Sequence, residues 1–578
     1  MIGLIAATAA GRRAATRLAA SLGDCRVYQE ASVAESVRLA WSQCEQLVCF
    51  LATGATVRLI APLLADKHRD PGVVCVDEAG RFAVALVGGH DGGANQLAGR
   101  VAEALEAQAV VTTATDAVGV PGLDTLGWPV TGELAAVSRA LLDGLPVALA
   151  ADLRYPLPAL PPNVQPLPGD AADAADAAAV IHVSDRSAPW AADAGALPRV
   201  VLHPRSLVVG VGASRGVTAE EVLDLVRDTL ADAGLSPHSL RCLASVDAKA
   251  EEQGLVEAAR TLGVELLTFA ADALAAVPVP NPSAAPLAAV GTPSVAEAAA
   301  VLGADDGELL VPKRKSAPEG RAAMCTVAVA RRPVRGRLAV VGLGPGSRDL
   351  LTDRARAELR RASVVVGLDQ YVDQIRDLLR PGTRIEATGL GAEEERARSA
   401  VRLAQQGLAV ALIGSGDAGV YAMASPALAE AGADIDVVGV PGVTAALAAS
   451  SLLGAPLGHD HVSISLSDLH TPWEVIERRV RAAASADLVV TFYNPRSRGR
   501  DWQLPKALAL LAEHRDPATT PVGVAHAVSR PDEWHTVTTL AEVDVTTVDM
   551  TTVVVVGNTA SRTVAGRMVT PRGYRWQE

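Results

Sequence analysis

The chain alternates short β-rich runs with longer amphipathic segments along most of its length. Strand-like runs stand at 47–52, 83–88 and 338–341, and helix-like segments at 12–22 and 95–105. Strands that alternate with helices in this way usually pair in parallel and are covered by helices. The 578 residues are also too many for one hydrophobic core, since cores stop growing at about 250–300 residues. The sequence therefore predicts a multidomain α/β protein.

Two changes in composition divide the chain into candidate domains. Six prolines between residues 156 and 168, followed by AADAADAAAV, predict a linker-like or loosely structured stretch. A second boundary falls at residues 331–336, where RRPVRGR precedes a new strand pattern. The expected domains are 1–120, 121–203 (a middle region with the Pro/Ala-rich linker), 204–332, 336–450 and 451–578.

Five loops in the last 240 or so residues each follow a strand-like run. They are GLGPG (342–346), GSGDAGVY (414–421), VPGVTAA (440–446), FYNPRSRGR (492–500) and GNT (557–559). Ligands of open α/β sheets bind outside the carboxyl ends of strands, so we expect these loops to form one cleft. The first loop is a poor dinucleotide fingerprint, because position 347 is Ser and Pro345 has no N–H to offer a pyrophosphate.

G-x-G-P-G, GD-x-x-x-Y, PG-V-T-A and YNPRS, in this order, resemble the tetrapyrrole (corrin/porphyrin) methylase family over about residues 336–576. GLDQYVD (367–373) together with FYNPRS is most similar to the precorrin-3B C(17)-methyltransferases of that family. The resemblance implies two α/β subdomains with S-adenosyl-L-methionine between them, and methylation of a corrin precursor with ring contraction. Methylation of another ring position, and an RNA or protein methyltransferase of the same fold, remain alternatives.

The resemblance also implies which residues bind the cofactor. They are Gly342, Gly344, Pro345, Gly346, Gly416, Asp417, Gly419, Val420, Tyr421, Val443, Thr444, Ala445 and Asn494. Asp417 is the acidic residue expected nearest the chemistry, with the capping of a turn after Gly416 as the alternative. A sulfonium-bound methyl group is already activated, so alignment of donor and acceptor is the main task and no side-chain nucleophile is needed.

A polycarboxylate ring would need cationic partners. Arg496, Arg498 and Arg500 on one loop are candidates, because guanidinium groups bind carboxylates in a bidentate manner. The alternative is a solvated basic loop. The formal charge of −13 speaks against nucleic acid as a partner, because neutralising phosphates needs an excess of Lys and Arg.

The N-terminal half carries VGGHDGGANQLA (87–98) and LATGATVR (51–58). With SVDAKAEEQGL and VPKRK, these segments resemble the cobalt-precorrin-5A hydrolase family over about residues 1–332. His90 is a candidate general base or partner of a ring carboxylate; the alternative is a loop histidine satisfied by the backbone. Asp91 stands where that family usually has a second His, so this half is expected either to hydrolyse a corrin lactone or only to bind corrinoids.

Six cysteines occur without a C-x-x-C pair, which predicts neither a metal site nor a disulfide framework. The opening MIGLIAATAAGRR does not resemble a secretory signal, and no apolar run approaches the roughly 18 residues of a membrane helix. We therefore expect a cytoplasmic protein with a small-molecule corrin precursor as its partner and no membrane association. The methylase resemblance implies a homodimer through the methyltransferase half.

Overall fold

The computed structural model of the chain describes residues 1–66, 69–89, 92–112, 122–167, 176–188, 197–318, 320–497 and 499–573. His90, Asp91 and Arg498 lie outside the described residues. The chain divides into two compact units. The N-terminal unit comprises Met1–Tyr155, Leu160–Val334 and Arg380–Gly382, and the C-terminal unit comprises Pro156–Ala159, Arg335–Leu379 and Thr383–Glu578.

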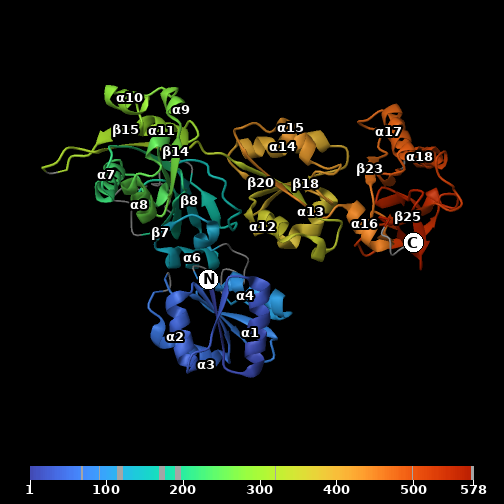
Figure 1. Cartoon of the computed structure of the whole chain (residues 1–578), viewed down its shortest axis with the longest axis horizontal. Helices are drawn as coiled ribbons and strands as arrows, with labels where there is room; N and C mark the ends of the chain where they lie inside the picture. Colours follow the sequence, from blue (N-terminus) through green and yellow to red (C-terminus); the bar gives the residue numbers. More distant parts are fainter. Residues whose placement is uncertain are drawn as a thin grey trace. The chain divides into compact units, whose positions relative to one another are not determined.

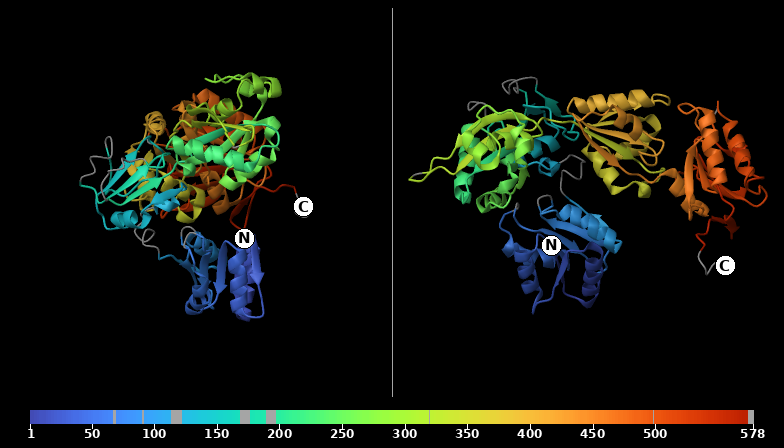
Figure 2. Two further views of the ribbon diagram at one scale, coloured as in Figure 1. Left: turned by 90° about the vertical axis from the view of Figure 1, so that its left-hand side faces the viewer. Right: turned by 45° about the horizontal axis from the view of Figure 1, so that its top comes forward.

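The first domain of the N-terminal unit is a six-stranded sheet of order β2-β1-β3-β4-β5-β6. Its strands are β1 (Ile2–Ala6), β2 (Cys25–Tyr28), β3 (Gln46–Phe50), β4 (Gly72–Val76), β5 (Phe82–Val87) and β6 (Gln108–Val110). Strands β1 to β4 are parallel, whereas β5 runs antiparallel to β4. Helices α1 (Ala9–Leu22) and α4 (Ala94–Leu105) pack on one face, and α2 (Val33–Gln43) and α3 (Thr53–Ile60) on the other. In Figures 1 and 2 these strands lie between the two helical layers.

The middle domain is a five-stranded sheet of order β7-β11-β10-β8-β9, with α6 (Leu134–Leu142) beside it. Its strands are β7 (Val130–Gly132), β8 (Val147–Ala151), β9 (Val164–Pro166), β10 (Ala179–Val183) and β11 (Arg199–Leu202). Strand β9 and the first two residues of β10 fall within the proline- and alanine-rich stretch, and the expected linker stays a prediction because residues 168–175 lie outside the described ranges. Pro166 is tolerated because β9 is an edge strand, where a missing N–H costs no ladder bond.

The third domain is a five-stranded sheet of order β14-β13-β12-β16-β15. Its strands are β12 (Leu207–Ala213), β13 (Leu240–Val246), β14 (Glu265–Phe269), β15 (Glu308–Lys315) and β16 (Cys325–Arg331). Helices α7 (Ala219–Asp232) and α8 (Gln253–Leu262) pack on one face. The other face is covered by α9 (Ala271–Ala275) and α11 (Ala296–Gly303), with α10 (Ala284–Val290) between them in the chain.

The C-terminal unit begins with a five-stranded, wholly parallel sheet of order β19-β18-β20-β17-β21. Its strands are β17 (Arg337–Gly342), β18 (Val364–Leu368), β19 (Arg384–Thr388), β20 (Ala409–Gly414) and β21 (Asp436–Val440). Helices α12 (Asp353–Arg361) and α13 (Asp369–Ile375) cover one face, and α14 (Glu393–Gln405) and α15 (Ala424–Glu430) the other, as Figure 1 shows.

The second sheet of this unit is mixed and has the order β23-β24-β27-β25-β26. Its strands are β23 (His461–Ser465), β24 (Val489–Tyr493), β25 (Pro521–His526), β26 (Trp534–Thr539) and β27 (Thr552–Val556). Helices α17 (Trp473–Ser485) and α18 (Gln503–Ala512) pack on one face and α16 (Ala445–Leu453) on the other. A small sheet adds β22 (Gly454–Ala455), β28 (Arg562–Val564) and β29 (Arg567–Val569).

These sheets confirm the predicted multidomain α/β fold. The domain boundaries expected from the sequence stay predictions. Within the described ranges, no helix is both long enough and apolar enough to cross a membrane.

Candidate functional site

Three loops meet at the carboxyl edge of the parallel sheet in the C-terminal unit. Strand β17 lies between β20 and β21, so the loops that follow these three strands are neighbours. The backbone N–H of Gly344 donates to the carbonyl of Gly416 at 3.0 Å, and the N–H of Gly416 donates back to Gly344 at 2.7 Å. The first two loops are therefore joined main chain to main chain.

Glycine is required where the three loops touch. A Cβ on Gly442 would lie 2.2 Å from the carbonyl oxygen of Gly416, and one on Gly342 would lie 2.7 Å from the same atom. Gly344 and Gly416 have φ values of 77° and 66°, a backbone conformation that residues with a Cβ rarely adopt. Side chains are excluded, so the surface of this junction is mainly backbone and small residues.

Asp417 ties two of these loops together. Its Oδ1 accepts a hydrogen bond from the N–H of Gly419 at 2.8 Å, and its Oδ2 accepts one from the N–H of Gly442 at 3.0 Å. Both carboxylate oxygens thus have partners within the chain. The contacts agree with the turn-capping alternative, and the catalytic role of Asp417 stays a prediction.

Two tyrosines connect the mixed sheet to this junction. The hydroxyl of Tyr493, at the end of β24, lies 2.5 Å from Oγ1 of Thr444 and accepts a hydrogen bond from the N–H of Ala446 at 2.9 Å. The ring of Tyr421 lies 5.1 Å from that of Tyr493, and its hydroxyl donates to the carbonyl of Ser463 at 2.8 Å. Burial raises the pKa of Tyr421 above its ordinary value.

The loop after β25 also contacts the junction, and the sequence did not predict it. Nε of Arg530 donates to the carbonyl of Pro345 at 3.0 Å, and the N–H of Ser347 donates to Oγ of Ser529 at 3.1 Å. Strand β25 runs antiparallel to β27, as β24 does, so the carboxyl ends of β24 and β25 lie at the same edge. The available signal was the run PVGVAH followed by AVSRPDEW, a strand with a polar loop after it.

Two of the three loop arginines expected to bind the substrate are described, and both have partners in the main chain. Nη1 of Arg496 donates to the carbonyls of Val545 and Thr546 at 3.1 and 3.0 Å. Arg500 is buried, and its Nη1 donates to the carbonyls of Leu466 and Asn494. These guanidinium groups hold the loop in place, and carboxylate binding by Arg496, Arg498 and Arg500 stays a prediction.

Asn494 follows β24 with a positive φ of 49°. Its Nδ2 donates to Oγ of Ser465, the last residue of β23, at 3.1 Å. Asn494 therefore joins the carboxyl ends of the two parallel strands of the mixed sheet. Its expected contact with the cofactor stays a prediction.

The GNT loop does not lie with the other four, which corrects the expectation of one cleft built from five loops. Strand β27 is antiparallel to β24, with Val490 opposite Val556. The N–H of Thr559 donates to Oδ1 of Asp487 at 3.0 Å, just before β24 begins. The carboxyl end of an antiparallel strand falls on the opposite edge of the sheet, and residues 557–559 go with it.

Comparison with known proteins follows the same division of the chain. Residues 337–544 match the family model of tetrapyrrole (corrin/porphyrin) methylases. A protein of Salmonella typhimurium named probable cobalt-factor III C(17)-methyltransferase is 48% identical over 240 residues, which cover 41% of this chain and 99% of that protein. The chain belongs to the tetrapyrrole methylase family. The family resemblance seen in the sequence is confirmed.

Other members of the family align over the same region. A precorrin-3B C(17)-methyltransferase of a Sinorhizobium species is 41% identical over 251 residues, which cover 41% of this chain and 97% of that protein. The solved structure of the methyltransferase CobJ has 39% identity and a TM-score of 0.39, and covers 41% of this chain and 100% of that chain. The chain spans about half the length of several further relatives, such as a cobalt-factor III methyltransferase of Priestia megaterium, of which it covers 46%.

The N-terminal unit matches two further family models. Residues 35–116 match the cobalamin synthesis G N-terminal region, and residues 207–330 match the cobalamin synthesis G C-terminus. These matches confirm that a tetrapyrrole methylase is fused here to a second region related to cobalamin synthesis.

The glycine-rich loop of the first domain lies at the amino-terminal edge of β3 and β4. Nε2 of Gln46, the first residue of β3, donates to the carbonyl of Gly92 at 3.0 Å. A Cβ on Gly92 would lie 2.6 Å from the backbone nitrogen of Gly72, the first residue of β4. The glycines on either side of His90 thus lie at the opposite edge from Thr53 and Thr56, which follow β3.

Three cations of the SVDAKAEEQGL and VPKRK segments in the third domain have partners in the chain. Nζ of Lys249 lies 2.8 Å from Oε2 of Glu252, whose Oε1 accepts from the N–H of Gly216. Nζ of Lys313 donates to the carbonyl of Asn281 at 2.7 Å. Arg314 pairs with Asp232 at 2.6 Å. The basic run is therefore engaged largely in structural contacts.

Polar side chains also gather at the carboxyl edge of the middle sheet, where the sequence suggested a linker. Ser184 donates to Asp152, and Asp185 accepts from Nε of Arg331 at 2.6 Å. Nε2 of His203 lies 2.8 Å from Oγ1 of Thr131. Burial, with a smaller contribution from His238, lowers the pKa of His203 to about 4, so the ring is neutral at neutral pH.

Proposed function

We propose that residues 335–578 transfer a methyl group from S-adenosyl-L-methionine to carbon 17 of precorrin-3B or its cobalt form. One observation carries the proposal. Three glycine-bearing loops converge at the carboxyl edge of a parallel sheet and are held against the carboxyl edge of a second sheet by Tyr493 and Arg530. The names of relatives that align over nearly their whole length support the choice of ring carbon.

The residues at the junction fit this cofactor. A Cβ on Gly416 would lie in ordinary contact with its neighbours, the nearest at 3.7 Å, so this backbone is not overpacked at the point where the three loops meet. The half-exposed Tyr421 ring offers an aromatic face at the same place. When bound, S-adenosyl-L-methionine supplies a methyl group that its sulfonium already activates, so a positioned site is sufficient and no nucleophilic side chain is needed.

The chain's own groups position the reactants. Asp417 joins the second loop to the third by accepting from the N–H of Gly442, and its bond from the N–H of Gly419 fixes the turn within the second loop. Tyr493 fixes the start of α16 by accepting from Ala446. Preorganised loops reduce the entropy lost on binding, and a displacement of about 1 Å can cost about 100-fold in rate.

The test uses the purified full-length chain with S-adenosyl-L-methionine carrying a labelled methyl group and with precorrin-3B or its cobalt form. Mass spectrometry should find a product heavier by one methyl group, and nuclear magnetic resonance should locate the label on carbon 17. A label on another ring carbon would assign the other ring position. Transfer to RNA or protein, with no labelled tetrapyrrole, would overturn the corrin assignment.

Substitution of Asp417 distinguishes a positioning role of its carboxylate from a catalytic role. We expect Asp417→Asn to lose one of its two loop contacts and to weaken cofactor binding about tenfold, because a hydrogen bond to a charged group is worth roughly 1.5–3 kcal/mol. The turnover rate at saturating cofactor should then recover. A lowered turnover at saturation would instead place the carboxylate in the chemistry. Asp436→Asn, at the exposed start of β21, is the matched control.

For the N-terminal half we propose a cobalt-precorrin-5A hydrolase that opens a lactone of the corrin ring. The matches to both cobalamin synthesis G models support this proposal. Wild-type protein should release acetaldehyde from that substrate, and His90→Ala should abolish the release. Absence of acetaldehyde from the wild type would favour a half that only binds corrinoids.

We also propose that the protein is a homodimer through residues 336–578. Sedimentation of the full-length chain should give twice the monomer mass. A monomer at all concentrations would overturn this proposal.

A further inference from the structure

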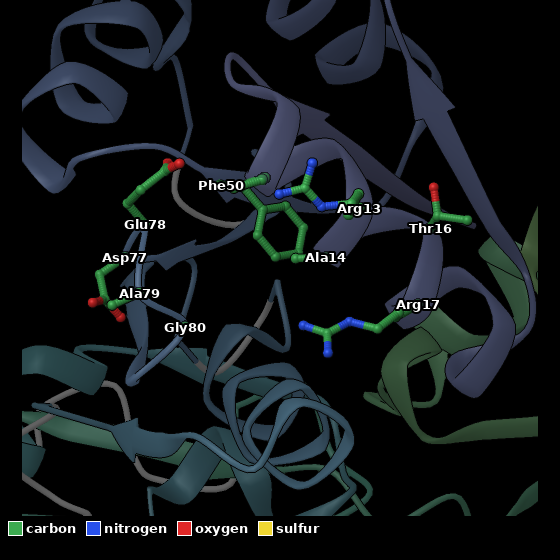
Figure 3. Close-up of a pocket in the computed structure, with 11 residues that line it drawn as sticks. Arg13, Ala14, Thr16, Arg17, Phe50, Asp77, Glu78, Ala79 and Gly80 are labelled. Atoms are coloured by element: carbon green, nitrogen blue, oxygen red, sulfur yellow. The ribbon is translucent and has the colours of Figure 1, made fainter.

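A pocket of about 590 Å³ lies in the first domain, between α1 and the turn that joins β4 to β5. Figure 3 shows Arg13 and Arg17 on the α1 side, Phe50 at its floor, and Asp77 and Glu78 on the turn opposite. Small-molecule sites typically have volumes of about 300–1,000 Å³. The pocket is therefore large enough for a small ligand or for the edge of a large one.

The pocket lies where this fold is suited to bind a ligand. Strand β1 is flanked by β2 on one side and β3 on the other, and the helices that follow β1 and β2 pack on opposite faces of the sheet. This arrangement makes the carboxyl ends of β1 and β3 a topological switch point, the usual ligand site of doubly wound sheets. Helix α1 follows β1, Phe50 ends β3 and Asp77 follows β4, so the whole lining belongs to that edge.

Two arginines supply the positive charge of the pocket. Arg13 and Arg17 are four residues apart on α1, so they share one helix face with about 5–6 Å between their Cβ atoms. Both are exposed, and within the described part of the chain neither guanidinium has an ion-pair or hydrogen-bond partner. In Figure 3 both side chains extend from α1 toward the turn.

The two carboxylates opposite are already engaged. Glu78 accepts a hydrogen bond from the hydroxyl of Thr8 at 2.8 Å. Oδ1 of Asp77 accepts from the N–H groups of Arg81 and Phe82 at 2.7 and 2.8 Å. Burial alone would raise the pKa of Asp77, but these hydrogen bonds outweigh it and hold that pKa below its usual value. The acids therefore shape the turn, and the arginines remain for a ligand.

We infer that this pocket binds a small molecule with two or more carboxylates, which pair with Arg13 and Arg17 while an apolar part lies against Phe50 and Ala14. Guanidinium groups match carboxylates in a planar, bidentate geometry. Gly88 and Gly92, in the glycine-rich loop after β5, lie at the other edge of the sheet. The pocket is thus separate from the loop assigned to hydrolysis, and the inference does not depend on the proposed methyltransferase.

Site-resolved labelling of the full-length chain tests the inference. An arginine-specific dicarbonyl reagent is applied with and without uroporphyrin III, a macrocycle that carries acetate and propionate groups, and with tricarballylate as a small polycarboxylate. Peptide mass spectrometry should show slower modification of Arg13 and Arg17 with both probes. Arg38, which is exposed on α2, serves as the internal control and should be modified at an unchanged rate.

Three outcomes of the labelling would overturn the inference. They are no protection of Arg13 and Arg17, equal protection of Arg38, and equal protection by inorganic phosphate at the same concentration. The first denies a site, the second shows unspecific attraction, and the third assigns a phosphate site instead of a polycarboxylate site.

Substitution gives an independent readout. Glutamine keeps the helix propensity of these exposed positions while removing the charge. The double variant Arg13→Gln/Arg17→Gln should lower tricarballylate affinity by about tenfold or more, as expected for charge-assisted hydrogen bonds. Arg38→Gln, with the smaller change of one charge, should leave that affinity unchanged. Unchanged affinity in the double variant, with an unaltered melting temperature, would overturn the inference.

Discussion

The parallel sheet of the methyltransferase region and the six-stranded sheet of the first domain place their glycine-rich loops differently. In the parallel sheet, the loops after β17, β20 and β21 all lie at one edge and contact one another through Gly342, Gly416 and Gly442. In the first domain, β5 is antiparallel, and its loop around Gly92 lies at the edge opposite to the loops of β3 and β4. Strand direction, and not the motif itself, therefore decides whether loops can share a site.

The close glycine contacts in the two regions also support different parts of the structure, loops in one and a strand in the other. At the methyltransferase junction, a backbone contact at Gly442 supports loops that form the proposed binding surface. In the first domain, the contact between Gly92 and Gly72 supports the start of a buried strand. The same change, glycine to alanine, should then affect activity in one region and stability in the other.

The largest effect is expected for Gly442→Ala. Its Cβ would lie 2.2 Å from the carbonyl of Gly416, which is backbone and cannot turn away. Overpacking costs about 1–3 kcal/mol, and displacement of the loops should lower methyl transfer by about 100-fold or more. Steady-state kinetics with labelled methyl donor measure the loss.

Gly439→Ala is the control for this change. Gly439 lies in β21, three residues earlier, and a Cβ there would meet no atom within 4 Å. The Gly439→Ala variant should transfer methyl groups at the rate of the wild type. Equal losses in both variants would show that the close contact of the three loops is not what the site depends on.

The second effect is expected for Gly92→Ala. A Cβ there would lie 2.6 Å from the nitrogen of Gly72, so the N-terminal unit should lose about 2 kcal/mol of unfolding free energy. Methyl transfer should be unchanged, because distant sites contribute independently. Chemical denaturation measures the loss of unfolding free energy, and a methyl-transfer assay of the same variant checks that activity is unchanged. Gly99→Ala on α4, with no atom within 4 Å of its Cβ, should cost nothing.

Much of the fold was predictable because periodicity and loop chemistry are local properties. The run that ends at Gly342 and the loop through Gly346 were placed correctly, as were the loops at Gly416 and Thr444, because all three strands run in parallel. The sheet order and the antiparallel direction of β27 come from long-range pairing, which a single strand pattern does not encode. The GNT loop was misplaced for that reason.

The middle domain and the loop after β25 show a second limit. Strand β10 was hidden because prolines and alanines around it indicate a linker, although its own run AVIHV is apolar and buried. Arg530 was missed because nothing in the sequence indicates that its guanidinium reaches Pro345, which lies 185 residues away in the chain. Contacts of this kind depend on how two sheets pack and not on local pattern.

Tyr493→Phe should have a smaller effect than either glycine change. It removes the hydroxyl that lies 2.5 Å from Oγ1 of Thr444 and accepts from the N–H of Ala446. Leaving a buried donor unsatisfied costs about 1–3 kcal/mol, and part of this should appear as a raised KM for the cofactor, since α16 begins there. Isothermal titration calorimetry with S-adenosylhomocysteine measures the change in affinity. Tyr371→Phe, whose hydroxyl makes no hydrogen bond with a described residue, is the control.

The last effect appears only in acid, and it concerns the N-terminal unit and not the methyltransferase region. Burial lowers the pKa of His182 and of His203 to about 4, from an ordinary value of 6.5. Between those values the unfolded chain binds more protons than the folded one, so stability falls as the pH falls from about 6.5 toward 4. The melting transition of the N-terminal unit should therefore move down when the pH is lowered through that range.

His203→Gln tests the cause of this acid sensitivity. Glutamine can keep a hydrogen bond to Oγ1 of Thr131 but cannot take up a proton, so the variant should show a shallower dependence of melting temperature on pH, whatever its stability at neutral pH. His535→Gln, exposed on β26, should leave the slope unchanged. An unaltered slope in His203→Gln would mean that acid acts on the N-terminal unit through other groups, and the buried ring would then be a packing residue without a titration effect.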